Sequence, residues 1–279
     1  MTPLFIIIIT CIVLFCICII IQFYQNKKLK TEGFNITLDY KPYTDVSDLV
    51  ENAEIPLKLF QTWHTKTLPP KMKYFVDKLK RDNPEFKHYL FDDNDCREFI
   101  REFFPDSVLD AFDRIVPGAY KADLWRYCVL YIYGGIYLDI KFQCIDGFKL
   151  IELTQKEYYV RDRKWDEVGI YNALLVCKPN NEILHKCIYA IVDNVKNKYY
   201  GINPLQPTGP QLMNKFFTPS EIKNMELSLD PGGQYINYTN SKNDTFHIMY
   251  PYPDYRTEQQ QLSKTPYYAH LWRQKAIYN

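Results

Sequence analysis

An excess of charge of one sign is absent from this 279-residue sequence. Its 34 Lys and Arg residues nearly balance its 33 Asp and Glu residues, which leaves a formal net charge of +1. A nucleic-acid-binding domain carries a basic excess, so the composition argues against nucleic acid as a partner. The sequence also has no internal repeat and no long low-complexity segment, so it does not indicate a repeat architecture.

Cysteine pairs with metal-binding spacing are absent as well. Of the 8 cysteines, three lie in the N-terminal apolar segment, and the other five form no Cys-x-x-Cys pattern. This distribution argues against a zinc site and against a dense disulfide scaffold. Buried free thiols are predicted for these five, while one or two disulfides stay open if the domain lies in a lumen. The five are Cys96, Cys128, Cys144, Cys177 and Cys187.

The N-terminal segment has the length and composition of a membrane anchor. Residues 4–21 are apolar apart from Thr10 and the cysteines, and Phe23 and Tyr24 follow as interfacial aromatic residues. About 20 such residues are needed to cross a bilayer. The basic n-region and the cleavage site of a signal peptide are both missing. We therefore expect a transmembrane helix within residues 1–25, in contact with the lipid bilayer through residues 4–24.

The orientation of this single-pass protein stays open. Three lysines between residues 27 and 30 follow the span, which favours a domain that faces the cytosol. Glycosylation triplets that begin at Asn35, Asn237 and Asn243 could be used only in the lumen of the endoplasmic reticulum or Golgi.

Residues 26–54 are polar and weakly patterned, which predicts a stem or linker before a domain at 55–279. The first half of that domain alternates between strands and helices, the order typical of a mostly parallel α/β sheet. In Asp92-Asp93-Asn94-Asp95 we expect helix capping rather than metal binding, because acidic acceptors suit a helix N-terminus. The expected strands lie at 57–62, 87–91, 136–140, 157–161, 171–177, 246–250 and 267–271, and the main helices begin at 70, 96, 119 and 182.

The most informative stretch is Ala119–Phe148. Apolar residues at three- and four-residue steps predict a helix that Gly134-Gly135 ends, because glycine adopts the left-handed conformation of a helix C-terminus. A short β-branched and aromatic strand then leads to Asp139, near the carboxyl end where ligands bind in open α/β sheets. Asp123 and Arg126 are three residues apart, so they share a helix face beside the apolar stripe. Taken alone, such a pair is more often an intrahelical ion pair than a binding site.

Together these residues resemble the glycosyltransferases of family 32, which share a DXD sugar-binding region. The resemblance covers roughly residues 55–273 and implies an A-type glycosyltransferase fold, a Rossmann-like mixed and mostly parallel sheet. Further matches are Ile55-Pro56-Leu57-Lys58, Gln61-Thr62-Trp63, Leu68-Pro69-Pro70, Asn83-Pro84, Asp92-Asp93, Thr208-Gly209-Pro210 and His270.

The resemblance also implies roles for individual residues. Asp123 and Arg126 would hydrogen-bond the donor sugar, and Asp139 would contact the nucleotide-sugar and a divalent ion, Mn²⁺ or Mg²⁺, to which His270 could add a ligand. Family members are retaining enzymes, so no catalytic base is assigned. Gln61, Thr62 and Trp63 are the expected nucleotide side, with Trp63 able to stack on the base, and Asn172, Thr208 and Gly209 the expected acceptor side.

One position departs from the family pattern. Lys141 stands where the second aspartate of Asp-x-Asp would be, and residues two apart on a strand face the same side. The ammonium could neutralise the donor diphosphate in place of part of the metal's role, or it could simply pair with Asp139. The metal dependence is therefore left open.

The sequence thus predicts a membrane-anchored glycosyltransferase. It would transfer a hexose from a nucleotide-sugar donor to a glycan or another hydroxyl acceptor, with retention of configuration. The alternative is a non-catalytic relative that binds a nucleotide-sugar or a glycan, and Lys141 is the feature that supports it.

Overall fold

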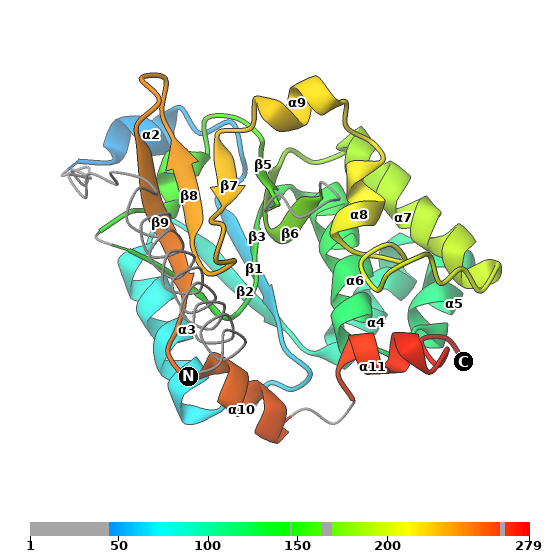
Figure 1. Ribbon diagram of the computed structural model, residues 1–279. Coiled ribbons are helices and arrows are strands. Elements are labelled where there is room, and N and C mark those ends of the chain that lie inside the picture. Colours follow the sequence, from blue (N-terminus) through cyan, green and yellow to red (C-terminus); the bar gives the residue numbers. More distant parts are fainter. Residues whose placement is uncertain (1–44, 146, 163–168, 263–265) are drawn as a thin grey trace, which may run out of the picture. The chain divides into compact units, whose positions relative to one another are not determined.

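The computed structural model describes residues 45–279 except 146, 163–168 and 263–265 (Figure 1). The predicted membrane span and most of the predicted linker lie outside the described residues. Within the described ranges, no helix combines the length and the apolar character that a membrane crossing requires. The end of the predicted linker forms a short helix, α2 (Ser47–Glu51). It is followed by Glu54 and Ile55, whose backbone N–H groups both donate to the carbonyl of Thr154.

The described strands form one mixed nine-stranded sheet in the order β2-β1-β3-β6-β5-β7-β8-β9-β4. The predicted mixed sheet is thereby confirmed, but the pairing, expected to be mostly parallel, is parallel in three of the eight neighbouring pairs and antiparallel in five. Parallel pairing is confined to β2-β1-β3 and to β5-β7, and the other neighbours are antiparallel. The strands are β1 (Lys58–Thr62), β2 (Lys87–Phe91), β3 (Gly135–Leu138), β4 (Phe142–Cys144), β5 (Tyr158–Arg161), β6 (Ile170–Cys177), β7 (Leu227–Leu229), β8 (Ile236–Thr239) and β9 (Thr245–Pro251).

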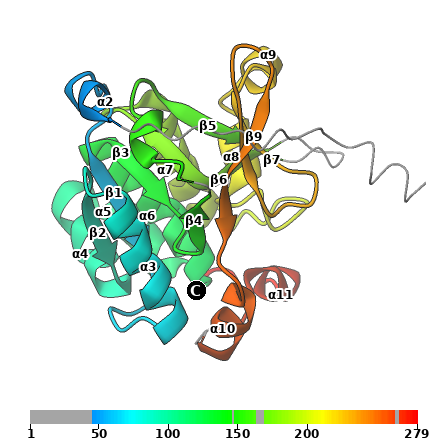
Figure 2. The same ribbon diagram turned by 90° about the vertical axis from the view of Figure 1, so that its left-hand side faces the viewer.

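The sheet must curl, because β3 and β4 are joined by only three residues although β4 forms the far edge. Four Cα-to-Cα steps span at most about 14 Å, so the β4 edge returns to the end of β3. Figure 2 shows β4 between β3 and β9. The connecting residues Asp139–Lys141 therefore lie where the curled sheet comes back on itself.

Helices cover one face of the sheet and a second hydrophobic core covers the other. Residues that alternate along the central strands β1, β3 and β6 pack into the two cores: Phe60, Tyr137 and Leu175 pack with the large helices, and their neighbours Leu59, Ile136 and Leu174 pack on the opposite side. In Figure 1, α4 to α7 lie together on the right and α3 lies on the left. The helices are α3 (Pro70–Asp82), α4 (Asp93–Phe103), α5 (Asp106–Arg114), α6 (Gly118–Tyr133), α7 (Glu182–Lys196), α8 (Pro210–Asn214), α9 (Pro219–Lys223), α10 (Tyr255–Leu262) and α11 (Tyr268–Arg273), with a 3₁₀ turn at Leu150–Leu153.

Several local predictions are confirmed. Pro70 occupies the first turn of α3, and β2 has the predicted bounds. The Asp92 carboxylate accepts from the Asp95 N–H, and the Asp95 carboxylate accepts from the Asp92 N–H. The acidic run is thus a capping box. The five cysteines after the N-terminal segment are free, and four are buried as predicted, whereas Cys144 is half-buried.

The predicted strand at 267–271 is wrong, because Tyr268–Arg273 forms helix α11. The aromatic-rich sequence Tyr-Tyr-Ala-His-Leu-Trp suits a strand by composition. Its apolar residues 268, 271 and 272 are also three and four apart, the spacing of a helix face. All three pack against the large helical core, so tertiary packing selects the helix.

Candidate active site

Helix α6 and strand β3 are joined at a point that only glycine can occupy. Gly134 has φ 58° and ψ −174°, a positive φ as predicted but with extended ψ rather than the left-handed helical value. An added Cβ at Gly134 would lie 2.7 Å from Pro179 Cδ, and one at Gly135 would lie 2.6 Å from the Lys58 carbonyl oxygen. The chain thus turns directly from the helix into β3 against β1, which fixes how far Asp139 lies from α6.

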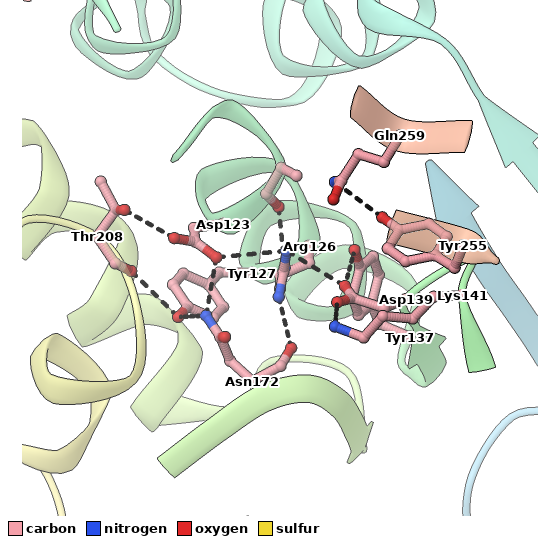
Figure 3. Close-up of polar contacts among 11 residues, drawn as sticks. Asp123, Arg126, Tyr127, Tyr137, Asp139, Lys141, Asn172, Thr208, Tyr255 and Gln259 are labelled. Atoms are coloured by element: carbon pink, nitrogen blue, oxygen red, sulfur yellow. Dashed lines mark hydrogen bonds and ion pairs between the residues drawn. The ribbon is translucent and has the colours of Figure 1, made fainter. Parts of the chain in front are cut away.

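Asp139 follows the last residue of β3 and is surrounded by donors (Figure 3). Its backbone N–H donates to the Ala173 carbonyl at 2.8 Å. Its Oδ1 accepts from the Tyr137 hydroxyl at 2.9 Å and lies 3.5 Å from Arg126 Nη2. Its Oδ2 accepts from Lys141 Nζ at 2.9 Å. Each carboxylate oxygen therefore already faces a cation.

Lys141 reaches Asp139 by a route that the sequence did not indicate. The predicted strand 136–140 ends early, at Leu138, and residues 139–141 form a turn closed by the Phe142 N–H to the Asp139 carbonyl at 3.0 Å. The two side chains meet across this turn, not along a pleated strand. The Lys141 ammonium also lies 5.0 Å from the Phe142 ring centroid and 5.5 Å from that of Tyr171.

Arg126 links Asp139 to the interior of the domain. Its guanidinium stacks over Tyr137 at 4.4 Å, donates through Nη1 to the Asn172 carbonyl at 2.7 Å, and lies 3.3 Å from Asp123 Oδ1. Helix α6 is buried on nearly all sides, so the face that carries Asp123 and Arg126 is covered as well. The intrahelical ion pair is present, inside the protein rather than on its surface.

Asp123 is the last charged residue of this network, on the side of Arg126 away from Asp139. Its Oδ1 accepts from Asn172 Nδ2 at 2.9 Å and its Oδ2 from the Thr208 hydroxyl at 2.7 Å. Asn172 also donates to the Tyr127 hydroxyl at 2.7 Å, and Tyr127 donates to the Thr208 carbonyl at 3.2 Å. A Cβ added at Gly209 would lie 3.3 Å from Asp123 Oδ2. The structure therefore brings the predicted donor-sugar and acceptor-side residues into one network.

Burial and neighbouring charge act differently on the two carboxylates. Burial raises the pKa of Asp123 and outweighs the opposing effects of Arg126, Thr208 and Asn172. Burial also acts to raise the pKa of Asp139, but Lys141 and Arg126 together hold it below its usual value. The attraction of Asp139 outweighs burial at Lys141 and raises the pKa of that ammonium. Asp139 and Lys141 are thus a charged pair at neutral pH.

The charged part of this network lies in a segment with known relatives. Residues 69–158 match the family model described as the glycosyltransferase sugar-binding region containing a DXD motif. This segment, about a third of the chain, is therefore similar to the sugar-binding region of these glycosyltransferases. The match contains the four charged residues from Asp123 to Lys141 and excludes the predicted nucleotide-side and acceptor-side residues.

Curated proteins with similar sequences include fungal mannosyltransferases. The chain is 29% identical over 166 residues to inositol phosphoceramide mannosyltransferase 2 of Schizosaccharomyces pombe, covering 59% of this chain and 47% of the relative. It is 34% identical over 128 residues to the initiation-specific alpha-1,6-mannosyltransferase of Candida albicans, covering 43% and 32%. The chain thus spans less than half the length of these relatives. Among solved structures, the PaToxG glycosyltransferase aligns over 73% of this chain and 84% of its own, with 17% identity and a TM-score of 0.48.

The residues around Asp139 do not fit a divalent-ion centre built by the protein. No group of three or more His, Cys, Asp or Glu side chains with metal-binding geometry occurs among the described residues. Asp139 is flanked by Lys141 and Arg126, and two like unit charges 4 Å apart repel by about 4 kcal/mol at an effective dielectric constant near 20. The other proposed ligand, His270, is an exposed residue of α11 whose ring lies 6.0 Å from that of Tyr267.

The three predicted nucleotide-side residues have different surroundings. Trp63 is half-buried and packs with the small cluster that includes Ile140 and Tyr255, next to the Asp139 turn. Gln61 is fully buried, with its Oε1 2.9 Å from His88 Nε2. The Thr62 hydroxyl donates to the Phe91 carbonyl at 2.9 Å. Of the three, Trp63 is the one whose surroundings adjoin the charged network.

Sequence reasoning missed the tyrosines that support the site. Tyr137 precedes Asp139 by two residues and Tyr127 follows Asp123 by four, so strand and helix periodicity could have indicated both. Tyr255, to which Gln259 Nε2 donates at 2.9 Å, comes from α10 and gave no local signal. Burial raises the pKa of Tyr255 to about 12, with the Asp139 charge as a further cause, so it is a neutral hydroxyl beside the charged pair.

Proposed function

We propose that this protein transfers a hexosyl residue from a nucleotide-sugar donor to a hydroxyl group of a glycan or glycolipid, with retention of configuration. Mannose is the first sugar to test, because the curated relatives named above are mannosyltransferases. The sheet would be of the A-type glycosyltransferase class, and the domain would be held at a membrane by residues 1–25.

The observation that carries this proposal is the position of Asp139. It lies at the carboxyl end of a central strand that pairs in parallel with β1, the location where ligands bind in open α/β sheets. It is tied to Asp123 through Arg126, and all three residues lie in the matched sugar-binding region. Specific binding of a polar sugar phosphate requires charged hydrogen-bonding groups that are already held in place.

In this proposal different residues bind different parts of the nucleotide-sugar. Asp139 and Lys141 face the diphosphate and the sugar, and Trp63 stacks on the base. Asp123 and Arg126 contribute to sugar binding, with Asn172, Thr208 and Gly209 on the acceptor side.

A second candidate function is supported by one specific observation. Lys141 occupies Asp139 Oδ2 at 2.9 Å, which leaves this carboxylate less available for catalysis than a free one. A non-catalytic relative would bind the nucleotide-sugar without cleaving it.

Turnover with a panel of donors distinguishes the two candidates. Full-length protein in detergent would be incubated with GDP-mannose, UDP-glucose or UDP-galactose and with a short mannoside or inositol glycolipid acceptor. Release of the nucleoside diphosphate and the anomeric configuration of the product would be measured. An α-linked product from an α-linked donor supports retaining transfer, whereas saturable donor binding with no release in wild type and Asp139→Asn alike supports the binding protein.

The proposed anchor has a separate test, which also addresses the open orientation. Full-length protein made in the presence of sealed microsomes should resist carbonate extraction. Protection of the domain from added protease would indicate a lumenal domain, and digestion would indicate a cytosolic one. Extraction into the carbonate supernatant would contradict anchoring.

A further inference from the structure

We propose that Lys141 is a built-in cation for the donor's diphosphate, and that it makes nucleotide binding by this protein independent of a divalent metal ion. The inference rests on the proposed function, because it concerns the phosphate side of the same site. It starts from a mismatch: the segment matches a DXD-type sugar-binding region, but a lysine stands at the position of the second aspartate.

The first argument is that the place for a metal ion is already taken. A divalent cation at Asp139 would replace Lys141 on Oδ2 or Arg126 and Tyr137 on Oδ1, and it would then stand beside the displaced cations. Arg126 cannot move away easily, because it is buried between the Tyr137 ring and the Asn172 carbonyl. Mn²⁺ and Mg²⁺ need several oxygen ligands, and Asp139 alone offers oxygens that are already engaged.

The second argument is that Lys141 is held in place before any ligand arrives. Its backbone carbonyl accepts from the Tyr252 N–H at 2.8 Å, its ammonium is bound to Asp139, and two aromatic rings lie beside it. A lysine side chain that is exposed to solvent must lose conformational freedom to bind a phosphate. Here the turn, the carboxylate and the rings have already restricted it.

The third argument is that the exposed part of the charged chain is its Asp139–Lys141 end. The side chains of Asp139 and Lys141 are 24% and 14% exposed, whereas Arg126 is 6% exposed. A lysine ammonium has three N–H donors. One is used by Asp139, so two remain for oxygens of a ligand that approaches from the open side.

A cation at this point matches the chemistry of the proposed step. The bond between the anomeric carbon and the diphosphate oxygen breaks, and its electron pair stays on that oxygen. The anomeric carbon bonds to the acceptor oxygen, whose proton leaves with the diphosphate. Negative charge therefore grows on the leaving group, and a preorganised positive charge stabilises it. Asp139 positions the ammonium and keeps it protonated.

Nucleoside diphosphate binding tests this without relying on turnover. GDP and UDP, with guanosine and uridine as uncharged references, would be titrated calorimetrically into full-length protein with EDTA or with Mn²⁺. For the wild type we expect a dissociation constant in EDTA within about threefold of that in Mn²⁺. For Lys141→Met we expect binding in EDTA to weaken by about tenfold or more, the range for a lost charged hydrogen bond, while nucleoside binding is unchanged.

Three further variants make the result specific. Lys141→Arg keeps the charge and should keep binding in EDTA. Lys141→Asp restores a carboxylate pair and should make binding depend on Mn²⁺. Lys149→Met is the matched control, because Lys149 Nζ also lies 2.9 Å from a carboxylate oxygen, that of Glu85, and it should bind as the wild type does.

The outcomes separate this inference from the proposed function. If GDP or UDP binds the wild type only with Mn²⁺, or if Lys141→Met binds in EDTA as well as the wild type, the inference is overturned and the function stands. If neither nucleotide binds under any condition, both fall. If Lys141→Met fails to fold, nucleotide binding by the wild type and by Lys141→Arg in EDTA still tests the inference.

Discussion

Asp123 shows how much depends on a single buried charge. Asp123→Ala would leave Arg126, Asn172 and Thr208 facing an apolar methyl group. Removing one partner of a buried ion pair costs about 3–5 kcal/mol. We expect a loss of this size in the free energy of unfolding, measured in urea, together with a lower melting temperature.

Asp110→Ala is the matched control for Asp123→Ala. Asp110 also pairs with an arginine on its own helix, Arg114, at 3.3 Å, but its side chain is 63% exposed. Exposed pairs contribute about 0–1 kcal/mol. Equal stabilities for the two variants would mean that the Asp123 network does not hold the fold.

His88 is predicted to make stability depend on pH. Burial, with a smaller effect of Lys80, lowers the pKa of His88 from 6.5 to about 4. Between these values the unfolded chain binds a proton that the folded protein does not, so stability falls as the pH is lowered from 6.5 to 4, by at most about 3 kcal/mol.

Urea unfolding at pH 7 and at pH 4.5 measures this effect. His88→Gln retains a donor for Gln61 and should lose less stability between the two pH values than the wild type does. His270→Gln, at an exposed position on α11, should behave as the wild type does. Parallel profiles for all three proteins would contradict the assignment to His88.

At the scale of elements, the junction between α6 and β3 is the most constrained point. Gly135 has φ 111°, and a Cβ there would meet the Lys58 carbonyl oxygen at 2.6 Å, within the β1–β3 pairing. We expect Gly135→Ala to destabilise the protein by about 1–3 kcal/mol or more. Gly118→Ala is the control, since nothing lies within 4 Å of its added Cβ, and it should be neutral or slightly stabilising in thermal unfolding. A Gly135→Ala variant as stable as Gly118→Ala would contradict the close approach.

Elements that carry their own local signals were predictable from the sequence, and elements defined by distant partners were not. The N-cap residue Asp92 marks the start of α4, and β2 lies between the Asn83-Pro84 turn and this N-cap. Strands β4, β7 and β8 are three or four residues long and exist through pairing with each other or with β5 and β9. No residue within such short segments distinguishes them from loops.

The candidate site follows the same division. The sequence placed Asp123 and Arg126 on the correct helix, and its motif showed that Lys141 departs from the family pattern. Asp139 was expected inside the strand at 136–140 and instead directly follows the end of β3. The sequence placed Lys141 on a continuing strand because periodicity cannot reveal that β3 ends at Leu138. It also treated Asp123 as a residue beside the stripe, since the covering by Thr208 and Asn172 comes from segments far along the chain.

At the scale of the whole molecule, the two ends of the chain should respond differently to deletion. We expect removal of residues 1–25 to give a soluble protein that unfolds cooperatively, because the helices and strands of the described part begin at Ser47. Size-exclusion chromatography and thermal unfolding would measure this. A truncated protein found only as aggregate, beside a well-folded full-length protein in detergent, would show that the apolar segment belongs to the core.

Removal of residues 277–279 should be far more harmful. Ile277 is fully buried, its carbonyl accepts from the Val116 N–H at 3.0 Å, and the Asn279 N–H donates to the Arg114 carbonyl at 2.9 Å. The last residues therefore hold the junction between α5 and α6. A shortened protein with an unchanged melting temperature would contradict this.

The three-residue link between β3 and β4 has a consequence for biosynthesis. Gln143 pairs with Tyr250, about a hundred residues later in the chain, so the turn that brings Lys141 to Asp139 cannot be fixed until β9 has left the ribosome. Closing a loop of that length is slow compared with forming the local helices. The charged pair should therefore be among the last features to form during translation. A nascent chain stalled before residue 245 would carry α6 and β3 and still lack nucleotide affinity.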